Sequence, residues 1–387
     1  MHPAVAVAYT LTLSILVAGA ACWALTGLKL LALSRSDSLR GMARAILGLL
    51  QIRPGLPLVA WTPRRAVPWG LIDLVAVIVL YIVAIFAAQL LFAGLGWLPQ
   101  AANGKELTLA DKGLLVWMNI VVSLGLLAVA LPLIVLRTGA NWRDLGFSWR
   151  EAWSDLKLGA IAFVMLAPPV YAIQGTLHYY WKPSKHPLLE MFKESPDAGF
   201  FALLFVAAAV VAPIFEELVF RVLLQGFLER AFSICRRAYN FQDQILELVF
   251  GTSSQNAPLQ PAVVADSTLL QPFTPAGELN PYLPPAILLD STETPIRAEL
   301  ADEAMPPPLT DWRAFFPIAL SALIFALMHY SHGPDWVALT LLAAGMGYLY
   351  QRTHRLLPSL VVHVLLNSLS MFGLWVQIYA LPPDLKG

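Results

Sequence analysis

The chain has 387 residues, of which 58% are hydrophobic and 13% are charged. Soluble globular domains carry about 25% charged residues, so this composition excludes an ordinary soluble domain. The formal net charge is zero, and therefore no global field favours a nucleic-acid partner. The two cysteines, Cys22 and Cys235, have no Cys-x-x-Cys spacing. They indicate neither a disulfide framework nor a thiolate zinc site.

Apolar runs longer than the roughly 18 residues that indicate a membrane span recur along the chain. We therefore predict an all-α fold, a polytopic transmembrane helix bundle of about eight spans. The first run lacks the preceding Lys or Arg of a cleaved signal peptide, so we expect it to be retained as a span. The expected spans are residues 4–27, 70–97, 113–136, 157–176, 200–228, 314–331, 335–351 and 357–380.

The distribution of Lys and Arg predicts how the spans are oriented. From Lys29 to Arg65 the chain carries seven basic residues against one acidic residue. The positive-inside rule makes this segment cytoplasmic and the N-terminus external. Alternation then makes residues 137–156 and 352–356 cytoplasmic, and both segments carry basic residues. Both termini are therefore expected to be external.

Residues 233–312 differ in composition from the segments around them. Eleven prolines lie between Pro258 and Pro308, without a helical period. This composition is typical of a disordered or extended insert, either a plain linker or a regulatory segment. Phe241–Phe250 before it resembles a short amphipathic helix on the membrane surface. The expected parts are residues 1–156 with three spans, residues 157–232 with 313–380 as a second bundle, and the insert 233–312.

Two adjacent carboxylates and a guanidinium interrupt the apolar run from Phe200 to Phe227. A charged side chain at bilayer depth costs at least about 2.5–3.5 kcal/mol, so each one needs a partner or a function. Glu217 and Arg221 are spaced i,i+4 on one helical face and are expected to form an ion pair. Glu216 is rotated by about 100° from Glu217 and points elsewhere. We expect Glu216 to be the carboxylate that is available for chemistry.

His329 is predicted to lie level with the glutamates. Sixteen residues separate Glu216 from Phe232, and sixteen separate Arg313 from His329. In regular, neighbouring helices both side chains then lie about 24 Å from the hairpin turn. Phe325 precedes His329 by one helical turn and can form a wall of a pocket. A hydrogen-bonded packing histidine is the alternative interpretation.

His363 and Asn367 share one face of the last span, at i,i+4 spacing. They can form an interhelical hydrogen-bond pair, or they can serve a metal or oxyanion site. Their depth is not matched by the helix count, because His363 lies only five residues beyond Pro358.

Other intramembrane polar residues bear on the alternatives to hydrolysis. Asp73, Gln89 and Asn119 are the obvious additions to a proton relay, as a proton-coupled transporter would need. These three residues are too few to form a continuous proton path across the membrane. His332 and Asp335 follow His329 in a short turn, where we expect them to be solvated.

Three motifs now carry a family resemblance. Glu216-Glu-Leu-Val-Phe-Arg221, Phe325-Ala-Leu-Met-His329 and His363-Val-Leu-Leu-Asn367 resemble, in this order, the EExxxR, FxxxH and HxxxN motifs of the CPBP (Abi) intramembrane proteases. This family comprises CAAX prenyl proteases and bacteriocin-processing enzymes. The link Gly345–Thr353 and the upstream Asp144–Phe147 are also similar to the family. Its compact pattern lacks the long insert.

The resemblance implies a membrane endopeptidase, either CAAX-type or peptide-processing. It makes Glu216 the general base and His329 its partner in activating water. His363 and Asn367 would stabilise the oxyanion or share in metal binding. The residues with supporting roles would be Glu217, Arg221 and Phe325.

The resemblance leaves the metal question open. Candidate ligands of a divalent metal such as zinc are Glu216, His329 and His363. The sequence lacks the His-Glu-x-x-His motif typical of zinc proteases. A metal-free, glutamate-activated water is therefore the favoured mechanism.

The resemblance also implies partners and a location. The substrate would be a peptide or protein, lipidated or not, and the chain would lie in the lipid bilayer of a bacterial cytoplasmic membrane. A non-catalytic scaffold or immunity protein that keeps the motifs is the alternative function.

Overall fold

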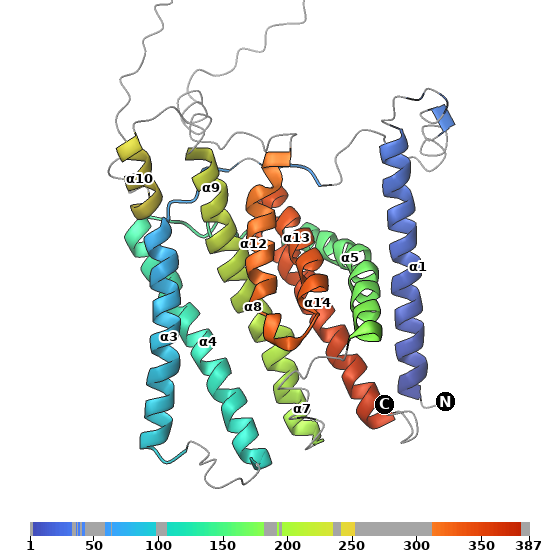
Figure 1. Ribbon diagram of the computed structural model, residues 1–387, viewed down its shortest axis with the longest axis horizontal. Coiled ribbons are helices and arrows are strands. Elements are labelled where there is room, and N and C mark those ends of the chain that lie inside the picture. Colours follow the sequence, from blue (N-terminus) through green and yellow to red (C-terminus); the bar gives the residue numbers. More distant parts are fainter. Residues whose placement is uncertain are drawn as a thin grey trace, which may run out of the picture.

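The computed structural model describes residues 3–32, 59–62, 64–97, 107–181, 196–234, 241–251 and 312–380, together with residues 36, 38, 41, 42 and 192. Every regular element in this part of the chain is a helix, which confirms the predicted all-α fold (Figure 1). Most of the predicted insert, residues 252–311, lies outside the described residues.

The helices divide into three groups along the chain. The first comprises α1 (Pro3–Leu31), α3 (Leu71–Gly94), α4 (Leu109–Thr138) and α5 (Ala152–Tyr180). The second is a continuous helical rod, Ala198–Ile234, called the central rod below. It contains α7 (Ala198–Phe205), η2 (Val206–Val211), α8 (Ala212–Glu217), η3 (Leu218–Gln225) and α9 (Gly226–Ile234). The third comprises α10 (Phe241–Phe250), η5 (Trp312–Phe315), α12 (Phe316–Leu327), η6 (Tyr330–His332), α13 (Trp336–Thr353), α14 (Leu356–Trp375) and η7 (Val376–Ala380).

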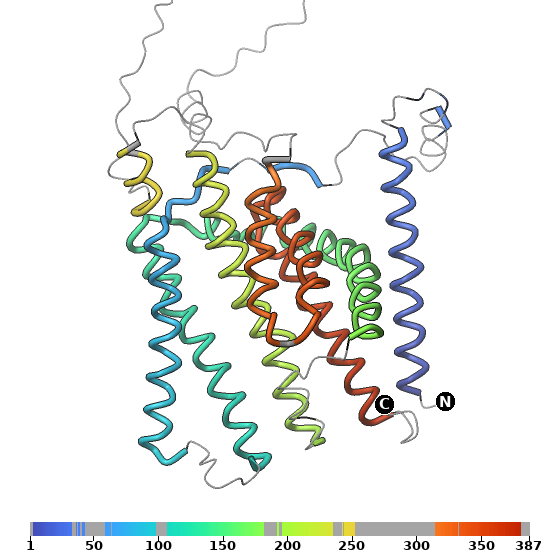
Figure 2. Tube along the Cα trace, viewed as in Figure 1, coloured from blue at the N-terminus to red at the C-terminus, as the bar shows by residue number. Residues whose placement is uncertain are grey.

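The central rod lies in the middle of the bundle. Helices α3 and α4 pack together at one edge and α1 stands at the other, with α5, α12, α13 and α14 between them (Figure 2). The start of α1 and the end of the last helix lie at the same end of the bundle.

All eight expected spans are helical, but not all are long and apolar enough to cross a bilayer. Six segments of the described chain are long and apolar enough to cross a bilayer. They are α1, α3, α4, α5, the central rod and residues 356–380. Helix α12 has 12 residues, or about 18 Å, against a hydrocarbon core of about 30 Å. The turn between α12 and α13 lies part-way along the central rod and α14 (Figure 1). The expected span 314–331 is therefore half of a hairpin that reverses inside the bundle.

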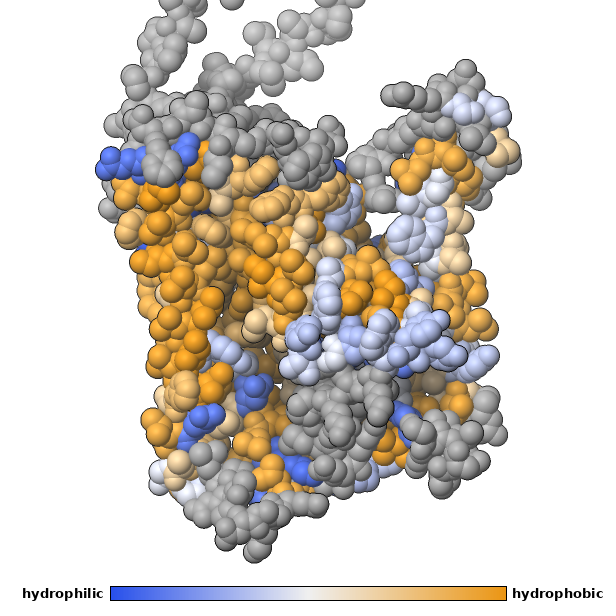
Figure 3. Space-filling model, in the orientation of Figure 1, coloured by the Kyte–Doolittle hydropathy of each residue, from blue (hydrophilic) through white to orange (hydrophobic). Residues whose placement is uncertain are grey.

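The outward faces of the helices match a lipid environment. Helix α3 exposes Val75, Ile78, Ile82, Phe86 and Leu90, and Figure 3 shows a hydrophobic surface along this edge of the bundle. Exposed apolar stripes of this size on a water-soluble protein would promote aggregation. In a bilayer these stripes are the face that contacts the lipid chains.

Helix α1 is attached to α5 where two adjacent prolines open the backbone. Pro168–Pro169 supply no N–H groups, so the carbonyls four residues earlier lose their helical donors. The indole Nε1 of Trp23 donates to the carbonyl of Met165 at 2.9 Å. One turn earlier, a Cβ on Gly19 would lie 2.7 Å from the carbonyl oxygen of Val164. The absence of a side chain on Gly19 therefore permits close approach of the two helices.

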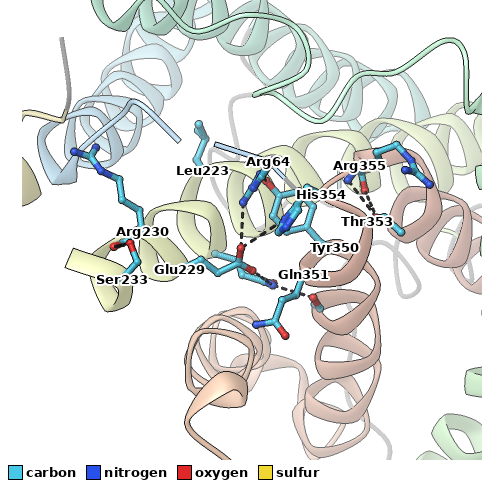
Figure 4. A network of polar contacts seen from close by, with 12 residues as sticks. Arg64, Leu223, Glu229, Arg230, Ser233, Tyr350, Gln351, Thr353, His354 and Arg355 are labelled. Atoms are coloured by element: carbon cyan, nitrogen blue, oxygen red, sulfur yellow. Dashed lines mark hydrogen bonds and ion pairs between the residues drawn. The ribbon is translucent and has the colours of Figure 1, made fainter. Parts of the chain in front are cut away.

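A buried polar network attaches the segment before α3 to the central rod and α13 (Figure 4). Arg64 donates to the Tyr350 hydroxyl at 2.9 Å and to Glu229 Oε2 at 3.1 Å. Gln225 donates to Glu229 Oε1 at 2.9 Å. His354 Nδ1 lies 3.8 Å from Glu229 Oε2, and neither ring nitrogen of His354 forms a hydrogen bond among the described residues.

Helix α10 is present as expected, and it packs on the bundle. Arg230 of the central rod forms an ion pair with Glu247, at 3.3 Å. After α10, Gly251 has a φ of +80°, and a Cβ there would lie 2.2 Å from the Pro68 carbonyl oxygen. Only glycine fits this turn without strain. α10 is therefore attached to the protein as well as being suited to the membrane surface.

We expect Trp23→Phe to loosen α1, because the freed Met165 carbonyl loses its donor in an apolar setting. Interhelical hydrogen bonds in membranes contribute about 1 kcal/mol, so the Tm of the detergent-purified protein should fall slightly. Gly19→Leu should lower Tm more, because the new side chain meets backbone. Gly27→Leu is the matched control, since no atom lies within 4 Å of a Cβ at Gly27. Equal Tm values for the two glycine variants would contradict this docking.

Acid is expected to destabilise the network around His354. Burial, with Arg64, Arg352 and Arg355 nearby, lowers the pKa of His354 well below its usual 6.5. The unfolded chain binds a proton there below about pH 6.5 and the folded chain does not, so stability is present above this pH and lost as pH falls. His354→Asn keeps a residue that tolerates the positive φ of 51°. The Tm of the His354→Asn variant should fall less than that of the unmodified chain between about pH 7 and 5. Parallel curves of Tm against pH for the two proteins would contradict the role of His354 in acid sensitivity.

Candidate active site

The paired glutamates lie between two π-helical stretches. α8 carries Glu216 and Glu217 and has six residues, with η2 before it and η3 after it. π-Helical turns are rare, and they occur frequently at functional sites. They also change the rise and rotation per residue, so a residue count based on a regular α-helix is only an approximate guide to depth.

Glu217 and Arg221 form the predicted ion pair. Arg221 Nε lies 3.3 Å from Glu217 Oε2, and both side chains are fully buried. The guanidinium also lies over the Phe325 ring, 5.1 Å from its centroid, in a cation–π contact. His363 is a third partner, with Nδ1 3.0 Å from Glu217 Oε1. The two buried charges thus compensate each other, although no nitrogen of the Arg221 guanidinium forms a hydrogen bond among the described residues.

Glu216 has different surroundings from Glu217, as the helical geometry predicts. Its side chain is 21% exposed, whereas that of Glu217 is not exposed at all. His363 Nε2 lies 3.6 Å from Glu216 Oε2. The single imidazole of His363 therefore faces both carboxylates. Because a carboxylate only accepts, Nδ1 donates to Glu217, and a neutral His363 presents its Nε2 lone pair toward Glu216.

His329 lies beyond the end of α12 rather than within it. Its Nδ1 lies 2.9 Å from the Phe325 carbonyl oxygen, which makes Nδ1 the donor. The Phe325 ring is 4.9 Å from the His329 ring and 5.9 Å from the His363 ring. Phe325 is itself 1% exposed. Phe325 therefore packs against both histidines.

Asn367 contacts the central rod one turn along α14 from His363. Its Nδ2 donates to the Ala208 carbonyl oxygen at 2.9 Å, within π-helical η2. Since His363 meets α8 and Asn367 meets η2, α14 runs alongside the rod. This packing resolves the apparent mismatch in the depth of His363, which lies beside both glutamates.

The candidate metal ligands do not converge as a set of three. Across the described ranges, no group of three or more His, Cys, Asp or Glu side chains is arranged to hold a metal ion. Glu216 and His363 approach each other, and Nδ1 of His329 lies against the Phe325 carbonyl.

The structure adds one residue that sequence patterns did not indicate. Tyr81 of α3 packs its ring against Phe215, the residue before Glu216, with centroids 5.2 Å apart. No spacing along the sequence connects α3 with α8. An intramembrane tyrosine in an apolar span was the sole available signal.

The expectation that Asp335 is solvated is wrong. Its Oδ1 accepts hydrogen bonds from Gln174 at 3.2 Å and pairs with His178 Nε2 at 2.7 Å. The reason is the short α12, which leaves the following turn packed against α5. Irregular backbone at membrane depth is tolerated where protein covers it. The side chain of His332 lies outside the described residues.

Comparison with protein-family models matches residues 198–243 and 302–369 to the family described as Type II CAAX prenyl endopeptidase Rce1-like. All the motif residues fall within these two segments. The chain contains an Rce1-like domain. This match is consistent with the CPBP/CAAX protease family, and the apolar helices make the chain an integral membrane protein. The search of curated proteins and that of solved structures give no match.

The buried ion pair of Glu217 and Arg221 is expected to stabilise the folded state. Glu217→Leu or Arg221→Met alone leaves a buried charge unpaired and should destabilise the fold by about 3–5 kcal/mol. The double variant removes both charges and should recover much of that loss, as measured by unfolding in detergent. An additive double variant would show that the two side chains do not act as a pair.

Proposed function

We propose that the chain is an intramembrane endopeptidase in which Glu216 activates the attacking water. The observation that carries this proposal is the position of His363, between the partly exposed Glu216 and the buried pair of Glu217 with Arg221. Glu217 fixes the imidazole through Nδ1, which holds Nε2 3.6 Å from Glu216 Oε2. The carboxylate and Nε2 are then two acceptors that can bind the same water molecule. Such fixed geometry favours general-base catalysis. The Rce1-like match supports peptide bonds as the target.

The proposed reaction uses the side chains as follows. Glu216 takes a proton from water as the water oxygen attacks the scissile carbonyl carbon. The resulting oxyanion accepts a hydrogen bond from the second N–H of the Asn367 amide, since only one is needed for Ala208. It accepts another from Nε2–H of His329 in its imidazolium form, because Nδ1–H is used by the Phe325 carbonyl. Glu216 then gives its proton to the leaving amine as the C–N bond breaks. His363, held by Glu217, keeps its Nε2 acceptor beside Glu216 throughout.

The substrate and setting are part of the proposal. The substrate is a peptide or protein that reaches the site from the membrane, and prenylation is a candidate feature because the matched family description names prenyl substrates. We place the chain in a bacterial cytoplasmic membrane with both termini external. The basic segments support this orientation. The transporter alternative weakens, because Asp73 is engaged in an ion pair with Arg137.

Glu216→Gln is expected to lower peptide cleavage at least 10²-fold, because general-base catalysis contributes about 10²–10⁴-fold. Tm and yield should stay close to those of the unmodified chain, since the side chain is partly exposed. Glu151→Gln, outside the bundle core, is the matched control. Full activity in Glu216→Gln would remove Glu216 from the mechanism. His329→Ala should also lose activity without losing the fold.

A peptide library, with and without a prenyl group, would separate an enzyme from a scaffold. The purified protein in lipid vesicles would be incubated with the library, and products would be identified by mass spectrometry. A parallel sample with chelator tests the metal requirement. We expect cleavage that persists with chelator. Uncleaved libraries throughout would favour the non-catalytic scaffold or immunity protein.

A further inference from the structure

A cavity of about 470 Å³ lies between α1, α5 and α13. None of the motif side chains lines it. Its walls are apolar, with Leu25 of α1, Ile161 and Met165 of α5, and Leu349 of α13 among them. The volume falls within the roughly 300–1,000 Å³ of small-molecule sites. Figure 3 shows a hollow between the upper part of α1 and the bundle.

The attachment of α1 explains why the cavity is open. Gly19 and Trp23 hold α1 against the proline-interrupted part of α5. The lining residues that α1 contributes start at Cys22 and run to Lys29. The cavity thus occupies the space where α1 diverges from α5 beyond the tryptophan.

One end of the cavity is basic. Lys29, in the last turn of α1, is part of the lining. Val59 lines the same cavity, and its carbonyl accepts a hydrogen bond from Arg352 Nε at 3.0 Å. One cation, Lys29, therefore lines an otherwise apolar cavity, and a second, Arg352, is bound to a residue of its wall. A basic end and an apolar wall match the two parts of an anionic phospholipid.

We propose that this cavity binds one acyl chain of an anionic phospholipid from the surrounding bilayer. The lipid phosphate lies beside Lys29, with Arg352 nearby, and the chain extends along Ile161 and Met165. No part of the argument depends on proteolysis, so the site stands or falls independently of the enzyme proposal.

Other occupants fit the walls less well. A helix from a second copy has a diameter of about 10 Å or more with its side chains, which exceeds a cavity of this volume. A peptide backbone needs hydrogen-bond partners at every residue. The Thr26 hydroxyl on this wall already donates to the Cys22 carbonyl at 2.9 Å. A flexible hydrocarbon chain needs no such partners.

Native mass spectrometry of the full-length protein in detergent tests the site. The protein would be titrated with phosphatidylglycerol and with phosphatidylcholine of the same acyl chains. We expect one phosphatidylglycerol per chain, bound at least about fivefold more tightly than phosphatidylcholine, since one basic residue near the lipid contributes about this factor. Lys29→Gln should reduce that preference about fivefold. Arg143→Gln, an exposed arginine away from the cavity, is the matched control.

A second pair of variants tests the apolar wall. Ile161, which is 53% exposed, lines the cavity, whereas Ile78 of α3 is 55% exposed and does not. Ile161→Trp should weaken both lipids, and Ile78→Trp should weaken neither. Equal binding of the two lipids, an unchanged preference in Lys29→Gln, or unchanged binding in Ile161→Trp would overturn the proposal. A dimer without bound lipid would assign the surface to a second copy instead.

Discussion

The buried ion pair of Glu217 and Arg221 is the constraint on which the site depends. Neither charge reaches water, so every neighbouring element must supply compensation. α14 supplies the His363 imidazole, and α12 supplies the face of Phe325. Because isolated charges at this depth are unfavourable by several kcal/mol, the three helices are held in one relative arrangement. The same contacts place His363 beside Glu216, so the requirement of stability also fixes the geometry of the candidate catalytic carboxylate.

The motif assignments could be made from sequence because they depend on local geometry. The i,i+4 spacing of Glu217 and Arg221 produces the same contact in any helix, and the adjacent position necessarily points Glu216 elsewhere. The apolar runs likewise define all eight helical segments. The division between spanning helices and the short α12–α13 hairpin depends on where a helix ends, which composition specifies poorly.

Contacts between distant helices could not be predicted in the same way. The mismatch in the depth of His363 disappears only when α14 lies beside a rod with π-helical stretches. Tyr81 of α3 packs against Phe215, beside Glu216, with no motif to indicate it. Asp335 found partners on α5 because the hairpin reverses inside the bundle. In each case the packing of helices that are distant in sequence determines the contact. A single sequence does not reveal which helices pack together.

The two prolines of α5 have a consequence for how helix α1 is recognised. Apolar surfaces do not distinguish another helix from lipid, since both are hydrocarbon. A carbonyl that has lost its own donor is different, and α5 has two adjacent ones, at Val164 and Met165. Trp23 donates a hydrogen bond to the Met165 carbonyl. Gly19, which has no side chain, lets α1 approach the Val164 carbonyl closely. Pro168 and Pro169 therefore set the register of α1 on the bundle, by a backbone defect rather than by complementary side chains.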